Sequence, residues 1–547
     1  MSASLHARGL SLSFGARPVL VDATVAVDPG QVVGLVGPNG VGKTTLLRVL
    51  AGLQALDAGT VVLAPSGAHV GHLPQEPERR DETVLEYLHR RTGVTAAQTA
   101  LDAATAALAA GDDGAGDAYS DALDTWLALG AADIDARVGE VWAELGLDER
   151  LIGQPMPSLS GGEAARTGLA ALMLARFDVF LLDEPTNDLD LDGLARLERF
   201  VTHLGAGCIL VSHDRTFLER VITHVVEIDE FTHTTTRYAG GWTAYLRERD
   251  LSRQHAREAY EEYDAKRSAL AGRAQREREW ATQGIGKAKR KPTDNDKNVR
   301  NAKIDQSEQL AGKAARTERA MERLEVVDEP REAWQLRLVL ASAPRGGDVV
   351  ARLDGAVVEQ GDFRLGPVSV QVNHGERVVV EGANGAGKST LLRALLGEVE
   401  VTSGTQWRGP GVVVGRLEQA RGQLSDAATV LDAFMAATGL LVPDARTLLA
   451  KFGIGAGHVG RPTGSLSPGE RTRLVLALLM ARGSNCLVLD EPTNHLDMPA
   501  IEQLEQALDT FDGTVLLVSH DRALLDNVRR TRTIRVENGR ILSDVPA

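Results

Sequence analysis

The sequence predicts an α/β fold in which two related domains follow one another and are joined by a long helical segment. Three observations support this prediction. A glycine-rich pattern that connects a strand to a helix occurs twice, an apolar run that ends in Asp-Glu occurs twice, and the stretch 243–331 between the copies has helical periodicity. A chain of 547 residues has room for roughly three or four units, each with its own core.

The glycine-rich pattern is typical of a phosphate-binding loop. Residues 37–45 read Gly-Pro-Asn-Gly-Val-Gly-Lys-Thr-Thr, with the apolar run 31–36 before them and the helical run 46–51 after them. The amides of such a loop surround a phosphate, the lysine reaches the β- and γ-phosphates, and the hydroxyl of Thr44 is a ligand for Mg²⁺. The expected ATP contacts are Gly37, Asn39, Gly40, Gly42, Lys43, Thr44 and Thr45.

The same pattern returns 345 residues later, where Gly37 corresponds to Gly382. The loop again lies between an apolar run, 377–381, and a helical run, 391–396. The chain therefore contains two copies of one nucleotide-binding unit, and Ser389 is the metal-binding hydroxyl of the second. The expected contacts in this copy are Gly382, Asn384, Gly385, Gly387, Lys388, Ser389 and Thr390.

Each copy also contains strands that end in side chains suited to catalysis. The apolar run 179–182 leads into Asp183 and Glu184, and a further apolar run ends at His213. The carboxyl ends of parallel strands meet at one edge of a sheet, so these groups can converge on one ATP. We expect Asp183 to hold Mg²⁺, Glu184 to polarise the attacking water and His213 to contact the γ-phosphate. The counterparts at an offset of 307 residues are Asp490, Glu491 and His520, and the amides of Gln75 and Gln419 are further candidates for the metal or the water.

Two helix starts offer a further site for an anion. The segment 159–163 reads Leu-Ser-Gly-Gly-Glu, in which Ser160 is a candidate N-cap and Gly162 leaves its amide open. An ordinary helix cap has the same pattern. The counterpart, 466–470, keeps Ser467 and Gly469.

These helix starts belong to a subdomain separate from the phosphate loops. Two copies that face each other head to tail would each give this helix start to the other's ATP. One site would combine Lys43 with Ser467, and the other would combine Lys388 with Ser160. The chain would then close on itself as a monomer, and hydrolysis would open it.

Two differences between the copies predict unequal sites. Pro468 lacks the backbone N–H that Gly161 offers. Phe14 precedes the first loop, where its ring can stack on adenine or serve as an ordinary strand aromatic. The residue 345 positions later is Glu359, and Phe363 lies nearby.

The first copy carries an insertion. The glycine loops are offset by 345 residues but the later segments by only 307, so the first copy is longer by 38 residues between them. We place the insertion at about 89–133, an alanine-rich segment with acidic patches that predicts two helices joined by a turn. It is either a protruding arm or a surface insertion without a partner.

The stretch between the copies predicts a helical hairpin. Apolar residues recur with helical spacing over 243–282 and 298–324. Gly284, Gly286, Pro292 and the segment Asp-Asn-Asp at 294–296 indicate a connecting turn between them. The sequence thus divides into a first domain at 1–242, a linker at 243–331, a connecting strand and turn at 332–347 and a second domain at 348–547.

The tip of this hairpin is basic. Residues 287–303 include seven basic and two acidic residues, in a chain whose formal net charge is −15. A positive tip suits the phosphate backbone of RNA or DNA, although a solvated charged coiled coil has a similar composition. The candidate RNA-binding residues are Lys287, Lys289, Arg290, Lys291, Lys297, Arg300 and Lys303.

Composition limits the class of protein. The net charge of −15 gives no support to a general nucleic-acid binder. Cys208 and Cys486 lie in apolar runs and are predicted core residues, not a disulfide or metal pair. No run approaches the ~18 apolar residues of a membrane span, and residues 1–6 lack the features of a signal peptide. We therefore expect a cytoplasmic protein with no membrane insertion.

Together, the two loops and the two Leu-Ser-(Gly/Pro)-Gly-Glu segments resemble the ATP-binding cassette superfamily over nearly the whole chain. Within it the chain resembles the ABC-F group, because two cassettes share one chain, the strand ends read Asp-Glu-Pro-Thr-Asn at 183–187 and 490–494, and 238–242 leads into a charged helical linker. This resemblance implies an ATPase that uses ATP and Mg²⁺.

The ABC-F resemblance also implies a partner. Such proteins bind the ribosomal exit-tRNA site, and their linker reaches toward peptidyl-tRNA and the peptidyl-transferase centre. They act as translation factors or protect ribosomes from antibiotics, and the basic tip would contact tRNA or ribosomal RNA. The alternatives are the nucleotide-binding subunit of a membrane transporter, which leaves the hairpin without a role, and a DNA-maintenance ATPase, which would have a longer coiled coil or zinc cysteines.

Overall fold

The computed structural model describes residues 3–15, 17–74, 80–290, 347–361, 363–417, 428–466, 468–494 and 496–546, with short pieces within 315–324. The chain divides into two compact units. One unit comprises residues 1–243 and 335–547, and the other comprises residues 244–334.

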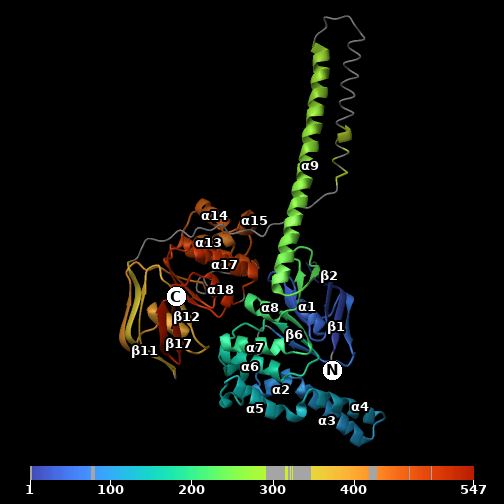
Figure 1. Ribbon diagram of the computed structural model, residues 1–547, viewed down its shortest axis with the longest axis vertical. Coiled ribbons are helices and arrows are strands. Elements are labelled where there is room, and N and C mark those ends of the chain that lie inside the picture. The colour runs from blue at the N-terminus through green and yellow to red at the C-terminus, as the bar shows by residue number, and fades with distance from the viewer. Residues whose placement is uncertain are drawn as a thin grey trace. The chain divides into compact units, whose positions relative to one another are not determined.

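The first unit contains two copies of one α/β architecture, which we call the first cassette (β1–β9) and the second cassette (β10–β18) (Figure 1). In the first cassette, a six-stranded sheet has the order β5-β6-β7-β3-β8-β9, and a three-stranded antiparallel sheet has the order β2-β1-β4. The strands are β1 Ser4–Phe14, β2 Arg17–Val27, β3 Val32–Val36, β4 Ala58–Ala64, β5 Val70–Leu73, β6 Val179–Asp183, β7 Gly207–Val211, β8 His224–Ile228 and β9 Thr235–Ala239.

The second cassette repeats this topology. Its sheets have the orders β14-β15-β16-β12-β17-β18 and β11-β10-β13. In each six-stranded sheet only the last strand is antiparallel to its neighbour. The strands are β10 Val349–Gln360, β11 Phe363–Asn373, β12 Arg377–Glu381, β13 Ser403–Arg408, β14 Val414–Arg416, β15 Cys486–Asp490, β16 Thr514–Val518, β17 Arg532–Glu537 and β18 Arg540–Pro546.

Apolar runs explain why the central strands lie inside. Every residue of β3, β6 and β7 is buried, as expected for parallel strands that are covered on both faces. Cys208 and Cys486 are buried in β7 and β15, and burial raises the pKa of both thiols. They are core residues, as their apolar flanks predict.

Helices complete each cassette. The first has α1 Lys43–Leu50, α2 Val84–Arg91, α3 Val94–Ala110, α4 Ala115–Ala128, α5 Ile134–Glu144, α6 Gly161–Leu174, α7 Leu191–Thr202 and α8 Arg215–Val221, with 3₁₀ turns at Ala131–Asp133, Glu149–Leu151 and Met156–Ser158. The second has α11 Lys388–Leu395, α13 Val430–Thr438, α14 Val442–Lys451, α15 Ala456–Val459, α16 Pro468–Ala481, α17 Met498–Thr510 and α18 Arg522–Asn527, with a 3₁₀ turn at Thr463–Ser465.

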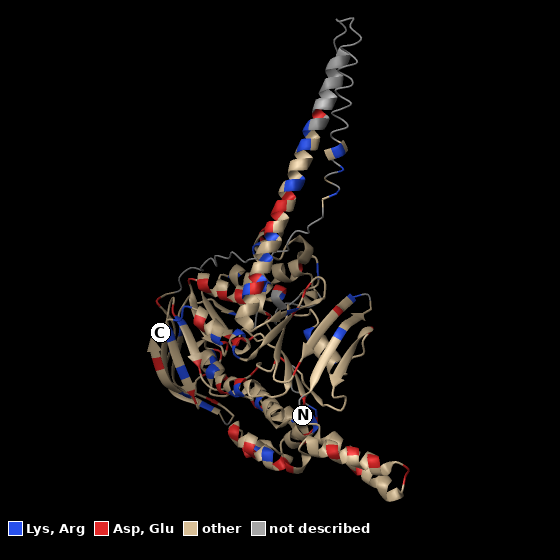
Figure 2. Ribbon diagram, turned by 45° about the vertical axis from the view of Figure 1, so that its right-hand side comes forward, with Lys and Arg blue, Asp and Glu red and all other residues tan. Residues whose placement is uncertain are grey.

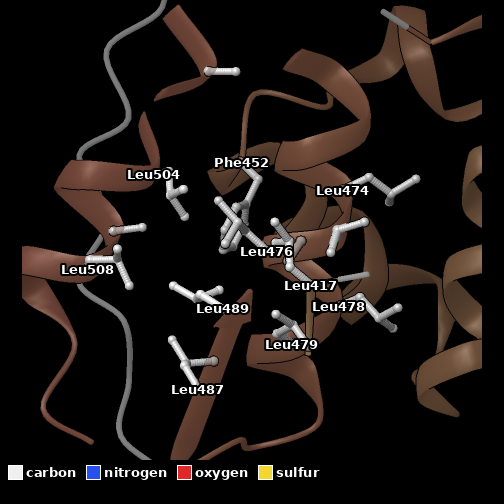
Figure 3. Close-up of a cluster of buried hydrophobic side chains, with 14 of the residues drawn as sticks. Leu417, Phe452, Leu474, Leu476, Leu478, Leu479, Leu487, Leu489, Leu504 and Leu508 are labelled. Atoms are coloured by element: carbon white, nitrogen blue, oxygen red, sulfur yellow. The ribbon is translucent and has the colours of Figure 1, made fainter. Parts of the chain in front are cut away.

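An apolar core in the second cassette fixes the helices that flank the site (Figure 3). Leu476 of α16, Leu489 of β15 and Leu504 of α17 point toward one another there, together with Phe452. Full burial of each such side chain stabilises the fold by about 1.5–3 kcal/mol. This packing holds α16 and α17 against the strand that ends in Asp490.

Helices α3 and α4 form an antiparallel pair within the first cassette (Figure 1). Trp126 Nε1 donates a hydrogen bond of 2.7 Å to Gln98 Oε1 across the pair. The segment 94–128 contains six aspartates and no lysine or arginine, so its charge is purely acidic (Figure 2). The two helices and the turn between them lie inside the predicted insertion.

The second unit contains most of α9, a single helix of 49 residues from Trp242 to Arg290 (Figure 1). A rise of about 1.5 Å per residue makes it roughly 70 Å long. The prediction that Gly284 and Gly286 belong to the connecting turn is wrong, because the helix continues through both residues. The rest of the predicted turn, Pro292 and 294–296, lies outside the described residues. Each glycine costs only about 1 kcal/mol in a helix, and the neighbouring Ala, Lys and Arg residues favour helix.

Several predictions lie outside the described residues. These are most of the second linker helix at 298–324, the connector at 332–346 and four of the basic residues, Lys291, Lys297, Arg300 and Lys303. Lys287, Lys289 and Arg290 belong to the last turns of α9.

Of the helices in the described part of the chain, no single one is long and apolar enough to cross a membrane. Helices α13 and α14, which are bent by 109° at the break between them, pass that test only as a pair.

Candidate ATP sites

The first glycine loop has the backbone that its glycines predict. Gly37 has a φ of 147° and Gly42 has a φ of 116°, both in the region that favours glycine. A Cβ at Gly37 would lie 2.8 Å from the carbonyl oxygen of Ile228, so no larger residue fits. Lys43 Nζ donates a hydrogen bond of 2.7 Å to Gly37 O, which folds the loop around the ammonium. Burial lowers the pKa of Lys43, although nearby carboxylates oppose this.

The second loop has the same geometry. Gly382 and Gly387 have φ values of 151° and 104°, and Lys388 Nζ donates to Gly382 O at 2.7 Å. Burial also lowers the pKa of Lys388. The two loops therefore offer equivalent cradles for phosphate.

The end of β6 suits a magnesium ion. The Thr44 hydroxyl partly offsets the effect of burial on the pKa of Asp183, whose Oδ2 is buried without a hydrogen-bond partner. Burial raises the pKa of Asp183, so a cation at this point would stabilise its charged form. No group of three or more His, Cys, Asp or Glu side chains that could hold a metal occurs among the described residues. Magnesium would fit through one carboxylate, one hydroxyl and the phosphates of the nucleotide, which is its usual mode of binding. Ser389 and Asp490 occupy the corresponding positions of the second site.

The glutamate after each of these strands is held in a strained conformation. Glu184 and Glu491 have φ values of 50° and 46°, although neither is glycine. The amide of Glu184 donates to Val211 O, and that of Glu491 donates to Val518 O, each at 2.9 Å. Burial raises the pKa of both side chains to about 7. A carboxyl group with this pKa is well matched to accept a proton from water near neutral pH.

A histidine lies beside each glutamate. His213 Nε2 is 3.1 Å from Glu184 Oε1, but it is aligned for a hydrogen bond with Asn39 Oδ1, at 3.2 Å. His520 Nε2 is 3.1 Å from Lys388 Nζ. Burial lowers the pKa of His213 to about 3 and that of His520 to about 4, so both are neutral at pH 7.

The two cassettes meet at the second site. A cavity of about 450 Å³ is lined from both cassettes, by residues that include Ser160, Gly162, Asn384, Glu491 and His520. A Cβ at Gly162 would lie 3.0 Å from Asn384 Cβ, so the start of α6 approaches the second loop closely. Ser160 is the N-cap of α6 and forms a capping box with Glu163.

The first site is lined by the first glycine loop and by strand residues. A cavity of about 540 Å³ contains Phe14, Asn39, Gly40, Gly42, Lys43, Thr44, Thr45, Asp183, Glu184 and His213 among its lining residues. The second cassette reaches this loop through Asp497, whose Oδ2 accepts a hydrogen bond of 3.1 Å from the amide of Asn39. Ser467, Gln75 and Gln419 lie outside the described residues, and α16 begins at Pro468.

The hairpins that precede the loops differ in register. Phe14 pairs with Arg17 at the end of the first hairpin, and Gln360 pairs with Phe363 at the end of the second. In the first hairpin Val19 forms a bulge, an extra residue that β11 lacks at this point. Phe14 is the last paired residue of its strand, and the residue in the same place in the second hairpin is Gln360, not Glu359. Phe14 is 55% exposed in the first cavity. The ring of Phe363 instead packs against the second loop, 2.7 Å from where a Cβ of Gly387 would lie.

Sequence reasoning missed two aspartates whose side chains form hydrogen bonds with the glycine loop of the opposite cassette. Asp190 caps α7 through Oδ1, and its Oδ2 accepts a hydrogen bond of 3.2 Å from the amide of Asn384. Asp497 caps α17 and binds Asn39 in the same way. Burial raises the pKa of Asp190, but the amide donors outweigh it and the net shift is downward. The available signal was a Leu-Asp pair shortly after each Asp-Glu-Pro-Thr-Asn segment, repeated at the offset of 307.

Comparison with known proteins places these sites in a family. The ABC transporter family profile matches residues 20–187 and 365–494. The tylosin resistance ATP-binding protein TlrC of Streptomyces fradiae is 32% identical and covers 96% of this chain and 95% of its own length. The energy-dependent translational throttle protein EttA of Haemophilus influenzae is 33% identical and covers 94% of this chain and 88% of its own. The ABC transporter F family member 2 of Arabidopsis thaliana is 30% identical, and the similarity covers 99% of this chain and 78% of that protein.

Solved structures share the fold. A structure titled "RNase-L Inhibitor" has a TM-score of 0.58 at 20% identity and covers 98% of this chain and 90% of that one. A structure titled "Model of ribosome-bound archaeal Pelota and ABCE1" has a TM-score of 0.57 at 20% identity, with 98% and 78% covered. Two cassette folds in tandem, two glycine loops and full-length similarity to ABC-F proteins lead to one conclusion: the chain is an ATP-hydrolysing member of the ABC-F family.

Proposed function

We propose that this ATPase binds the ribosome at the exit-tRNA site and uses its inter-cassette helical segment to act on peptidyl-tRNA and the peptidyl-transferase centre. The observation that supports this most directly is similarity over nearly the whole chain, linker included, to a protein named as a translational throttle and to one named for tylosin resistance. The helix α9 gives the linker a length of roughly 70 Å, which suits a probe of a deep ribosomal site. A ribosomal partner would place the protein in the cytoplasm.

ATP would hold the two cassettes together in this proposal. The start of α6 and the second glycine loop line one cavity, so a nucleotide bound there would contact both cassettes. Magnesium would be held by Thr44 and Asp183 in one site and by Ser389 and Asp490 in the other, with Gln75 and Gln419 as further ligands, and it would supply positive charge against the phosphates. Glu184 and Glu491 would accept the proton of the attacking water, and His213 and His520 would orient the terminal phosphate.

Co-sedimentation tests the partner. The Glu184→Gln/Glu491→Gln double variant should bind ATP without releasing it by hydrolysis, and should pellet with ribosomes in the presence of ATP. Recovery with membranes instead of ribosomes would support the transporter-subunit alternative. Recovery with neither would contradict the proposal.

Charge reversal tests the tip. We expect Lys289→Glu/Arg290→Glu/Lys291→Glu to weaken ribosome pelleting while leaving ATP affinity unchanged, because phosphate contacts from basic residues dominate affinity for RNA. A matched control reverses three exposed arginines outside the linker, Arg150, Arg352 and Arg529. If the tip variant and the control pellet equally, the tip has no role in RNA binding.

The relative named for tylosin resistance gives drug protection specific support within this proposal. A sensitive host that expresses the protein should then grow at higher concentrations of a ribosome-targeting antibiotic than a host that expresses the Glu184→Gln/Glu491→Gln variant. Unchanged growth across a panel of such antibiotics would favour a role as a translation factor.

A further inference from the structure

Two arginine–glutamate ion pairs join the cassettes beside the ATP sites. Arg215, the first residue of α8, pairs with Glu505 on α17. Arg522, the first residue of α18, pairs with Glu198 on α7 at 2.6 Å. The pairs are related by the offset of 307 that relates the cassettes, and none of the four side chains is more than 20% exposed.

The first pair completes a ring of contacts around the first site. Arg215 lies two residues after His213, whose Nε2 is 3.2 Å from Asn39 Oδ1. The amide of Asn39 donates to Asp497, which caps α17. Glu505 lies on the same helix and returns to Arg215. The histidine and the glycine loop of one cassette are thus held by one helix of the other.

The second pair completes the corresponding ring. Asp190 caps α7 and accepts from the amide of Asn384 in the second loop. Glu198 on α7 accepts from Arg522, two residues after His520. The Nε2 of His520 lies 3.1 Å from the lysine of the same loop. Each ring contains one glycine loop, one histidine turn and one helix from the opposite cassette.

We propose that Arg215 and Arg522 are positioning residues for ATP hydrolysis, which hold each histidine in place only when the cassettes are closed. Separation of the cassettes breaks each pair, because its two partners belong to different cassettes. A charge-assisted contact between mostly buried groups is strong and depends on geometry, so it transmits closure to the histidine turn. ATP binding to a single glycine loop does not require it.

The charges nearby explain why arginine occupies these positions. Helices α8 and α18 pack against each other, so their N-cap residues Asp214 and Asp521 lie close together. The charge of Arg522 acts on Asp214, and that of Arg215 acts on Asp521. Without the arginines, the carboxylates of Asp214 and Asp521 and those of the two paired glutamates would repel one another across the interface.

The two pairs are not equivalent. Glu198 Oε2 also accepts a hydrogen bond of 2.8 Å from Arg220 in its own cassette. The residue that corresponds to Arg220 at the offset of 307 is Asn527, which cannot form this ion pair. When Arg522 is lost, Glu198 therefore keeps Arg220 as an ion-pair partner. When Arg215 is lost, Glu505 loses the arginine with which it pairs. We expect Arg215→Ala to lower kcat more than Arg522→Ala.

A charge swap in the full-length chain tests the proposal. The variants are Arg215→Glu, Arg215→Glu/Glu505→Arg, Arg215→Lys and, as a matched control, Arg529→Glu, which breaks an ion pair between Arg529 and Asp509 within one cassette. Steady-state kcat and KM for ATP are measured, with nucleotide affinity from a fluorescent ATP analogue and folding from thermal unfolding.

We expect Arg215→Glu to lower kcat about tenfold with nucleotide affinity within about threefold of the parent. The swapped variant should recover most of this loss, Arg215→Lys should fall between, and Arg529→Glu should match the parent. A parental kcat for Arg215→Glu, or a swapped variant no faster than the single one, would overturn the proposal. If Arg215→Glu unfolds, the Arg215→Lys variant decides the question. A lower kcat with an unchanged KM for ATP supports the proposal, and a parental kcat overturns it. These readouts need no ribosome, so they are independent of the proposed partner.

Discussion

At the scale of single residues, the chemistry depends on the glutamates that follow β6 and β15. Both have left-handed backbones that only their surroundings can hold, and both are paired through their amides to the neighbouring strand. Burial raises the pKa of each to about 7. Their environment, more than their identity, makes them suitable as general bases.

This environment predicts a pH dependence. Below pH 7 the carboxyl groups of Glu184 and Glu491 are mainly protonated in the free enzyme and cannot accept a proton, and above it they are ionised. Values of kcat/KM for ATP should therefore rise between pH 6 and 8 with a midpoint of about 7, since this ratio reports the free enzyme. His213 and His520, whose pKa values burial lowers to about 3 and about 4, add no step in this range. A flat profile would exclude these carboxyl groups as bases.

The glutamates also allow the two sites to be compared. We expect Glu184→Gln and Glu491→Gln to lower ATPase activity by different amounts, because the site of Glu491 faces the start of α6 at Gly161, whereas α16 begins at Pro468, which has no backbone N–H. The double variant should fall about 100-fold or more. Turnover of the purified single variants measures this. Equal losses would contradict unequal sites.

At the scale of elements, the starts of α6 and α16 distinguish the cassettes. Both helices begin at the corresponding position, with Gly161 in one and Pro468 in the other. Proline fits the first position of a helix, so the fold tolerates the difference. The difference is one backbone N–H at the helix start: Gly161 can offer it to a phosphate, and Pro468 lacks it.

An exchange at this position isolates that amide. Gly161→Pro should fold normally, because the preceding Ser160 has φ −63° and ψ 162°, as a residue before proline requires, and no heavy atom lies within 4 Å of the position of a Cβ. ATPase activity should fall about threefold or more if a charge-assisted hydrogen bond to phosphate is lost. Pro468→Gly, the reverse change, should raise it. Parental turnover in both variants would show that this amide does not distinguish the sites.

At the scale of the whole molecule, the cassettes are joined by a few side chains that have two partners. Asp190 and Asp497 each cap a helix in their own cassette with one carboxylate oxygen, and each accepts an amide of the opposite glycine loop with the other. Folding of one cassette and closure on the other therefore share the same residues.

Serine can separate these two roles. Asp190→Ser/Asp497→Ser keeps an N-cap of similar strength, so stability should change by less than about 1 kcal/mol. The hydroxyl cannot satisfy both amides at once, so ATPase activity should fall while thermal unfolding stays near that of the parent. Asp148→Ser, at the cap of a 3₁₀ turn away from the sites, serves as the control. Activity equal to that of the control would show that these contacts do not support hydrolysis.

The local patterns of the sequence determined the cassette fold and the family. The glycine pattern predicts a loop between a strand and a helix, and an apolar run that ends in Asp-Glu predicts a buried strand. In both cases the residues that determine the local structure are neighbours in the sequence. The repeat at two offsets then identified two cassettes and the inserted helices. The core positions of Cys208 and Cys486 followed from their apolar neighbours.

Only the tertiary structure decided how distant residues meet. The partners of Asp190, Asp497, Arg215 and Arg522 lie hundreds of positions away, so no local pattern contains them. The register that aligns Gln360 with Phe14 depends on a bulge at Val19, and the continuity of α9 through two glycines depends on the helix as a whole. Local sequence sets which elements form, but packing sets which of their side chains share a site, because that choice is made by the sum of many contacts across the chain.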